Sequence, residues 1–176
     1  EQAWIKHQLL ESYLEKLMLI VGMAAKRQGT IEICYVDCFS GPWGTSELES
    51  TSIAVSLRTM AKCRQKLAEL GVTASMRALY IERDDEAFGN LERYLDSATP
   101  DTVSAKCFHG DFVDLREQIL TWSGRDAFTF FFIDPKGWKS IVIENLRPLL
   151  QRPRSEFLIN FIYDFINRTA SMGELQ

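Results

Sequence analysis

Four acidic residues follow four apolar, strand-like runs of the chain: Asp37, Glu82, Asp111 and Asp134. In an open α/β sheet, ligands lie outside the carboxyl ends of the strands, where carboxylates can accept hydrogen bonds from the hydroxyls and amines of a nucleoside. A single acid at such a position is often a helix cap. Four acids at four strand ends form one constellation, so the pattern predicts a nucleoside-binding edge of a sheet.

A turn of small residues follows the first acid. Asp37 is followed by Phe39, Ser40 and Gly41, and Gly44 comes three residues later. Glycine lets the backbone approach a ligand without a Cβ in the way. An acid here would repel phosphate, and the turn lacks both the Lys-Ser/Thr pair of a phosphate loop and the Gly-x-Gly-x-x-Gly of nicotinamide-dependent oxidoreductases. The turn favours a cofactor whose middle is neutral or positive; a tight strand-to-helix turn without a ligand is the alternative.

Glu82, Arg83, Asp111 and Phe112 are the residues expected beside the nucleoside. Glu82 can accept hydrogen bonds from both ribose hydroxyls, or it can cap the next helix. Asp111 can accept from the exocyclic amine of adenine, with Phe112 beside the ring, or it can cap the helix that follows. Asp37 can fix the glycine turn through backbone N–H groups, or it can face a cationic part of the ligand.

The elements that must position these residues alternate along the chain. Apolar residues at i, i+3 and i+4 spacing predict helices, and apolar β-prone runs predict strands. Helices are expected at 3–26, 50–70, 84–95, 113–122 and 141–150, and strands at 31–37, 76–82, 103–109, 127–133 and 156–163. This alternation predicts one α/β domain over 1–176. Its Rossmann-like, doubly wound, mostly parallel sheet lies in a core at 31–163, on which the N-terminal helix (1–28) packs.

Charge and composition narrow the function classes. The net charge of −4 and the pI of about 5.3 argue against a protein that coats nucleic acid by bulk charge. Two local basic clusters are interpreted as solvated helix faces and loops. Their members are Lys62, Arg64 and Lys66, and Arg147, Arg152 and Arg154.

The cysteines indicate a reduced protein. Four cysteines form no CxxC pair and only two histidines occur, so neither a structural zinc site nor another metal site is expected. No apolar run of 18 residues or more appears, and we expect a cytoplasmic protein that does not enter a membrane. The chain begins without Met and stops soon after an apolar run, which is compatible with a fragment whose C-terminal part is missing.

The motifs together resemble those of class I S-adenosylmethionine-dependent methyltransferases, over roughly residues 13–163. The resembling segments are Tyr35–Gly44, Ile81-Glu82, Gly110-Asp111-Phe112 and Ile133-Asp134-Pro135. The resemblance implies that the turn cradles the methionine portion of S-adenosyl-L-methionine. It also implies that the acid after the second strand holds the ribose and that the acid after the third holds adenine.

A closer resemblance is to the three-Cys-motif partner family. That family is similar to this chain in an N-terminal helix with Lys followed by a Leu/Tyr-Leu pattern (Lys6 to Leu14), in an Asp-x-Phe-x-Gly-Pro-Gly turn, and in Asp-Pro-x-Gly after strand four. Trp43 stands where the second glycine of the turn is usual. Glu82 lies 45 residues after Asp37 (82 − 37), against roughly 20 in a dinucleotide fingerprint. The resemblance implies a partner protein encoded nearby.

The segment after the fourth strand resembles the Asp-Pro-Pro-aromatic loop of methyltransferases that act on exocyclic amines of bases. The resemblance implies that Asp134 and Pro135 hold the amine of an RNA or DNA base, and that Trp138 stacks on that base. Lys136 is interpreted as an exposed loop charge, with a phosphate contact as its alternative, and Trp138 as equally able to pack on a neighbouring helix. A methyltransferase-fold module that binds the cofactor or a partner protein without catalysis is the alternative function.

Overall fold

A computed structural model describes residues 2–41, 51–135 and 142–160. The elements in these ranges are α1 (Gln2–Ala24), β1 (Thr30–Asp37), α2 (Ser52–Glu69), β2 (Thr73–Glu82), α3 (Asp85–Ala98), β3 (Ser104–His109), α4 (Arg116–Ser123), β4 (Phe128–Ile133), α5 (Ile143–Leu150) and β5 (Ser155–Ile159). The predicted alternation of helices and strands is confirmed.

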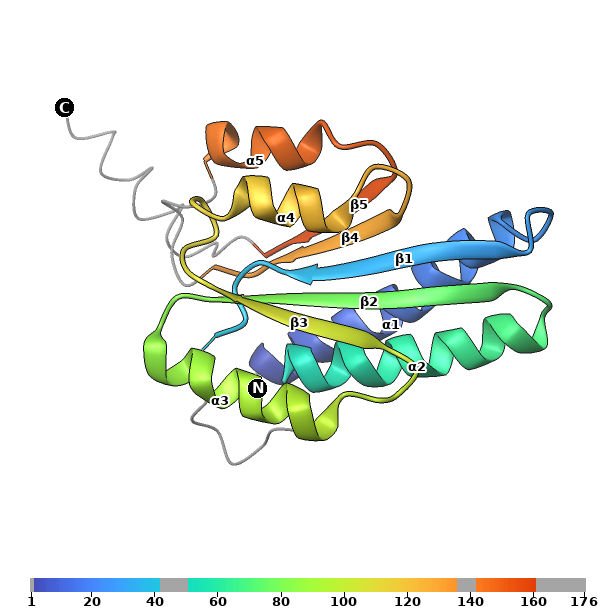
Figure 1. The fold of residues 1–176 in the computed structure, drawn as a ribbon, viewed down its shortest axis with the longest axis horizontal. Helices are drawn as coiled ribbons and strands as arrows, with labels where there is room; N and C mark the ends of the chain where they lie inside the picture. The colour runs from blue at the N-terminus through green and yellow to red at the C-terminus, as the bar shows by residue number, and fades with distance from the viewer. Residues whose placement is uncertain (1, 42–50, 136–141, 161–176) are drawn as a thin grey trace.

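The five strands form one parallel sheet in the order β3-β2-β1-β4-β5. Helices α1, α2 and α3 cover one face, and α4 and α5 cover the other (Figure 1). The chain moves outward from β1 to β3 and then returns to β4 on the other side of β1. The sheet order therefore reverses between β1 and β4, which is where ligands bind in open α/β sheets.

Two hydrophobic cores hold the layers together. Strands that are apolar throughout can be buried on both faces, as parallel sheets require. On β1, Tyr35 belongs to the core beneath α1, α2 and α3, and the next residue, Val36, belongs to the core beneath α4 and α5. Phe130 and Phe131 of β4 divide in the same way, and all four side chains are fully buried.

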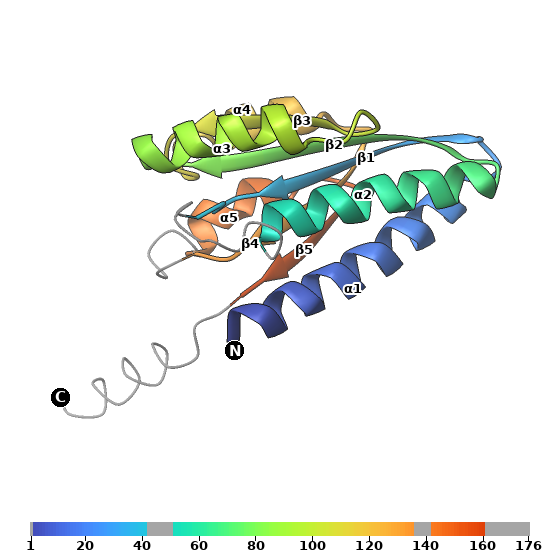
Figure 2. The same ribbon diagram turned by 90° about the horizontal axis from the view of Figure 1, so that it is seen from below.

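The N-terminal helix packs on the rest of the domain, as its apolar stripe predicts. Leu10, Leu14 and Met18 of α1 are fully buried in the first core. Figure 2 shows α1 alongside α2 on this face of the sheet. Glu15 of α1 lies 2.9 Å from Lys62 Nζ and 2.6 Å from Lys66 Nζ of α2. These partly exposed ion pairs contribute at most about 1 kcal/mol each, so burial of the apolar stripe fixes the helix.

A close approach of α1 to α2 gives the first prediction. A Cβ on Gly22 would lie 2.5 Å from Leu67 Cδ2, and the Leu67 side chain is fully buried. Gly22→Ala should therefore lower the free energy of unfolding by about 1–3 kcal/mol, measured by urea titration, although Ala usually favours a helix by about 1 kcal/mol. Gly89→Ala on α3, where the added Cβ meets nothing within 4 Å, is the matched control and should stabilise. Equal effects of the two substitutions would contradict close packing at Gly22.

Several details differ from the sequence-based expectations. Arg152 is 8% exposed, so its assignment to a solvated cluster is wrong. Helix α4 begins at Arg116 rather than at 113, because the Asp111 carbonyl accepts from Asp114 and Leu115 N–H and holds the intervening residues in a turn. Strand β2 begins at Thr73, since its first residues continue the ladder with β1. Strand β5 spans Ser155–Ile159, and residues 161–163 of the expected strand lie outside the described residues.

The four cysteines are free thiols, and those of β1 and the turn after it, Cys34 and Cys38, are buried as small apolar residues. Within the described ranges, no helix has the length and apolar character needed to cross a bilayer.

Candidate functional site

Backbone hydrogen bonds gather the ends of the strands at one edge of the sheet. Ser40 N–H, in the turn after β1, donates to Ile81 of β2 at 3.0 Å, and Gly110 N–H, after β3, donates to Glu82 at 2.9 Å. On the other side, Asn160 N–H after β5 donates to Ile133 of β4 at 2.9 Å. The four predicted acids therefore lie along the same edge, and Asp37 and Asp134 lie on the two sides of the reversal point.

Asp37 is a fully buried carboxyl group. Its Oδ1 accepts from Phe39 N–H at 3.2 Å, and its Oδ2 accepts from the Ser52 hydroxyl at 2.7 Å and from the Tyr35 hydroxyl at 3.5 Å. The pKa of Asp37 is raised to about 7, mainly by burial and to a smaller extent by the negative charge of Asp134, while these hydrogen bonds oppose the rise. The contact with Phe39 N–H fixes the turn, which is one of the two predicted roles of Asp37.

Asp134 is oriented by a residue that the sequence does not single out. The amide Nδ2 of Asn160 donates to Asp134 Oδ1 at 2.7 Å, while the backbone of Asn160 pairs with β4. A polar residue inside the apolar run 157–163 is the signal that could have found it. Pro135 follows Asp134 within the described residues, whereas Lys136 and Trp138 lie outside them.

Glu82 is 8% exposed and its carboxylate is held by the chain that follows it. Its Oε1 accepts from Arg83 and Asp84 N–H, each at 2.8 Å. Asp84 is the cap of α3, because its side chain accepts from Ala87 N–H at 2.9 Å. The alternative role of Glu82 as that cap is therefore filled by another residue, and Glu82 is fixed at the edge by two backbone donors.

Asp111 combines a local and a longer contact. Its Oδ1 accepts from Val113 N–H at 2.8 Å, and its Oδ2 lies 3.8 Å from Nη1 of the exposed Arg83. The pair joins the turn after β2 to the turn after β3. Phe112 is almost fully buried in the core beneath α4, with its ring centroid 5.3 Å from that of Phe39. The structure thus places both predicted aromatic residues against each other beneath the edge.

The glycine turn has two further features. Gly41 has a φ of +76°, a conformation that favours glycine, which accounts for glycine at this position. The Oγ of Ser40 is buried, and no partner for it is found among the described residues. Gly44 and Trp43 lie outside the described residues. A buried hydroxyl without a partner costs free energy, so a ligand atom at this turn would relieve that cost.

Sequence reasoning missed the role of Ser52 as a donor to Asp37. The cap of α2 is Thr51, whose hydroxyl accepts from Ala54 N–H at 3.2 Å. Ser52, in the first turn of α2, instead binds Asp37 across the segment that follows the glycine turn.

In the described part of the chain, the carboxylates at the strand ends are not arranged to hold a metal ion. Among the described residues, no group of three or more His, Cys, Asp or Glu side chains is placed to hold a metal ion. Comparisons of the chain with protein-family models, with curated proteins and with solved structures give no match. The fold and the contacts at the strand ends are therefore the evidence on function.

Proposed function

We propose that the protein is an S-adenosylmethionine-dependent methyltransferase with the class I fold. The observation that carries the proposal is the pair of carboxylates on the two sides of the reversal point, Asp37 and Asp134, with Glu82 at the end of the neighbouring strand β2. The negative charge of Asp134 contributes to the raised pKa of Asp37, and a positively charged ligand beside these two carboxylates would be favoured. A sulfonium cofactor with an ammonium group and a ribose matches these charges.

The start of helix α2 argues against a pyrophosphate cofactor. Dinucleotides place their phosphates on the N-terminus of the helix after the first strand. Here that helix begins at Ser52, whose hydroxyl donates to the Asp37 carboxyl at 2.7 Å. A carboxyl group therefore lies beside the first turn of this helix, and its negative charge would repel a phosphate bound there.

The residues at the edge fit the proposed cofactor. Glu82 is oriented by two backbone donors and would accept from the ribose hydroxyls, with Arg83 beside it. Asp111 would contact adenine, and the buried Phe112 would support that side of the site through its contact with Phe39. The buried Ser40 Oγ would find a partner in the methionine portion. S-adenosylmethionine would supply an electrophilic methyl group. The chain's own contribution is alignment of the methyl acceptor, which lowers the barrier without a metal.

The methyl acceptor that we propose is an exocyclic amine of a nucleic-acid base. Asp134, held by Asn160, would accept a hydrogen bond from that amine and orient its lone pair. The loop that continues through Lys136 to Trp138 supports this acceptor by its resemblance to base-amine methyltransferases. The turn at Asp37 likewise supports membership of the three-Cys-motif partner family and, with it, a partner protein. A cofactor-binding module without catalysis is the other proposal, and it is separated from the first by experiment.

Titration calorimetry tests cofactor binding. S-adenosylmethionine and S-adenosylhomocysteine should both bind, and NAD should not. Glu82→Ala should weaken both affinities by about 10- to 100-fold, because a charge-assisted hydrogen bond to the ribose is lost. Glu86→Ala, an exposed acid on the first turn of α3, is the control and should leave them unchanged. Binding of NAD alone would overturn the proposal.

Transfer of a labelled methyl group to RNA, DNA or protein tests catalysis. Asp134→Asn should abolish transfer to nucleic acid while cofactor binding persists, and Asp126→Asn, in the exposed turn before β4, should be unaffected. Cofactor binding without transfer to any acceptor would favour the module. Full activity of Asp134→Asn would remove Asp134 from the catalytic residues.

A further inference from the structure

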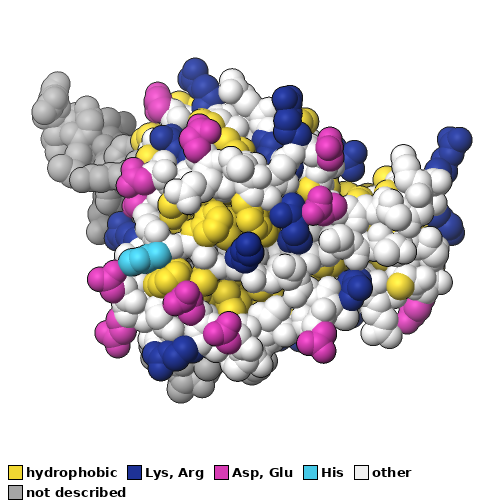
Figure 3. Space-filling model, viewed as in Figure 1, with side chains coloured by type: hydrophobic (Ala, Val, Ile, Leu, Met, Phe, Trp, Pro, Cys, Tyr) yellow, Lys and Arg dark blue, Asp and Glu magenta, His cyan; other side chains and the backbone are white. Residues whose placement is uncertain are grey.

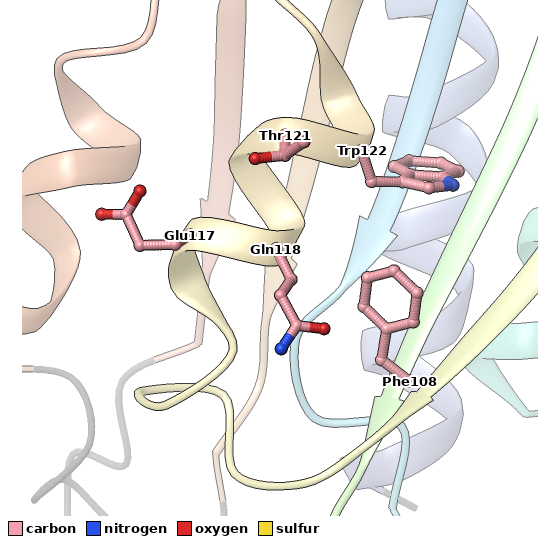
Figure 4. A pocket seen from close by; sticks show the side chains of 5 residues that line it. All are labelled: Phe108, Glu117, Gln118, Thr121 and Trp122. Carbon is pink, nitrogen blue, oxygen red and sulfur yellow. The ribbon is translucent and has the colours of Figure 1, made fainter.

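An open groove of about 360 Å³ lies between α4 and β3, on the face of the sheet that α4 and α5 cover. Figure 3 shows an apolar patch between these elements, with Lys and Arg side chains at its border. Phe108 comes from β3, and Gln118 and Trp122 lie on the side of α4 that faces it (Figure 4). Ligand sites span roughly 300–1,000 Å³, so this groove suits one planar group rather than a dinucleotide.

Contacts with Arg77 hold the indole ring of Trp122 in place. The guanidinium of Arg77, on β2, lies 4.6 Å from the centroid of the Trp122 ring, and its Nη1 donates to the Trp122 carbonyl at 2.9 Å. Arg77 Nε in turn lies 2.6 Å from Glu32 Oε1 on β1. A ring fixed in this way loses little conformational entropy when a second ring stacks beside it, which favours binding.

One acid and one cation bear on the charge of this site: Glu117 of α4 lines the groove, and Lys106 lies two residues before Phe108 on β3. Side chains two residues apart on a strand point to the same face, about 6.6 Å apart. Lys106 is therefore on the Phe108 side of β3, and its side chain is exposed. In proteins that bind single-stranded nucleic acid, positive side chains hold the phosphates and nearby aromatic rings stack on the bases.

We propose that this groove binds an unpaired adenine of a single-stranded nucleic acid. The base would stack on Phe108 and Trp122, and the amide of Gln118 would pair with the N6 amine and N7 of its edge, because a glutamine amide offers both a donor and an acceptor. An aliphatic side chain of a peptide would use neither the amide nor Lys106. The site goes beyond methyl transfer, since it needs neither the cofactor nor the strand-end acids.

The position of the groove connects it with the edge that carries the acids. Phe108 is followed by His109, Gly110 and Asp111, so the groove begins where β3 reaches that edge. A strand held here would extend along α4 and bring its neighbouring nucleotides toward the carboxyl ends of the sheet.

Fluorescence anisotropy with labelled 12-mers tests the proposal on the whole chain. Oligo(A) should bind more tightly than oligo(U) and oligo(C), and oligomers of 7-deazaadenine, which lack N7, should lose most of that preference. Phe108→Leu should weaken oligo(A) binding by about 5- to 150-fold through lost stacking. Gln118→Leu should remove the preference for adenine. Lys106→Gln should weaken all sequences alike and reduce the slope against salt by about 0.7.

Matched variants separate binding from folding. Phe157→Leu removes a half-buried aromatic residue from the same core on the opposite edge strand, and Gln151→Leu removes an exposed amide after α5. Both should bind oligo(A) as the unmodified chain does, and every variant is checked by its urea midpoint. If Phe108→Leu folds and binds oligo(A) normally, the groove assignment is overturned.

Three other outcomes would also overturn it. Binding of AMP as tightly as oligo(A) would assign the groove to a free nucleotide. Binding of an arginine-rich peptide that is lost in Phe108→Leu, with no oligonucleotide bound, would assign it to a protein partner. Equal affinity for all three homopolymers would show binding to the phosphate backbone only. Failure of S-adenosylmethionine to bind would contradict the proposed function and leave the oligonucleotide result standing.

Discussion

Replacing Asp37 by Asn should make the protein more stable at pH 8, by up to about 4 kcal/mol. The pKa of Asp37 rises from 3.8 in the unfolded chain to about 7 in the folded protein, mainly through burial. Each pKa unit corresponds to about 1.4 kcal/mol. Because the folded pKa is the higher one, the stability that this group provides is complete below pH 4. It is lost as the pH rises through 7.

Asparagine keeps the contacts of Asp37 without its charge. Its carbonyl oxygen can accept from Phe39 N–H, and its amide can donate to the Ser52 hydroxyl, which turns to accept. Urea unfolding at several pH values should show the gain of Asp37→Asn shrinking from pH 8 to pH 5. Asp101→Asn, at an exposed carboxyl group before β3, should stay within about 0.5 kcal/mol throughout. If Asp37→Asn were less stable than the unmodified protein at pH 8, the prediction would be wrong. The hydrogen bonds to the charged carboxylate would then outweigh the cost of burying it.

If S-adenosylmethionine binds as proposed, the same ionisation of Asp37 should affect its affinity. A cationic ligand beside Asp37 and Asp134 favours the charged form of Asp37, so binding below pH 7 must release a proton. The affinity for S-adenosylmethionine should therefore rise with pH between 5 and 7, by up to about tenfold per unit. In Asp37→Asn this pH dependence should be lost, together with part of the affinity. Under the proposed function, the negative charge that lowers stability at Asp37 would favour binding of the cofactor.

Arg152→Met should lower the free energy of unfolding by at least about 3 kcal/mol. The guanidinium of Arg152 is buried, and it donates to one hydroxyl and to several backbone carbonyls on both sides of β4. Its acceptors are the carbonyls of Ser123, Gly124, Ala127, Pro153 and Arg154, and the hydroxyl of Ser155. Methionine fills similar space but leaves these buried acceptors without donors.

A matched pair of variants isolates the geometry of Arg152. Arg152→Lys keeps the charge and loses the planar fork, so most of the loss should remain. Arg147→Met, on the exposed side of α5, should change the urea midpoint little. Because Arg152 lies at the amino ends of β4 and β5, far from the strand-end acids, its loss should act on stability and leave cofactor affinity per folded molecule unchanged. Equal stability of Arg152→Met and the unmodified protein would show that water satisfies the freed carbonyls.

The apolar runs and the acids that end them could be predicted from the sequence because both are local. Strand β1 is apolar throughout, and a strand buried on both faces needs nothing else to be recognised. The edge at which Asp37, Glu82, Asp111 and Asp134 meet follows once the strands are taken as parallel. The order of the strands does not follow, since it depends on which apolar surfaces pair over long distances.

Contacts between segments that lie far apart in the sequence could not be predicted from it. Asn160 and Ser52 act on Asp134 and Asp37 through hydrogen bonds that only the folded sheet creates. Arg152 was grouped with exposed cations, because a basic residue in a polar turn looks the same whether it is solvated or buried. The groove at Phe108 and Trp122 could not be predicted from the sequence either, because its two walls come from different elements.

The central place of β1 in the sheet has a consequence for how the protein folds. Ile33 pairs with Met76 on β2, 43 residues later (76 − 33), and with Phe128 on β4, 95 residues later (128 − 33). Contacts between residues distant in sequence form slowly, because the intervening chain must first be ordered. During synthesis β1 can pair with β2 and β3 long before β4 emerges from the ribosome. The junction of β1 and β4, whose ends carry Asp37 and Asp134, is therefore among the last parts of the sheet to form, and until then one edge of β1 is open to wrong partners.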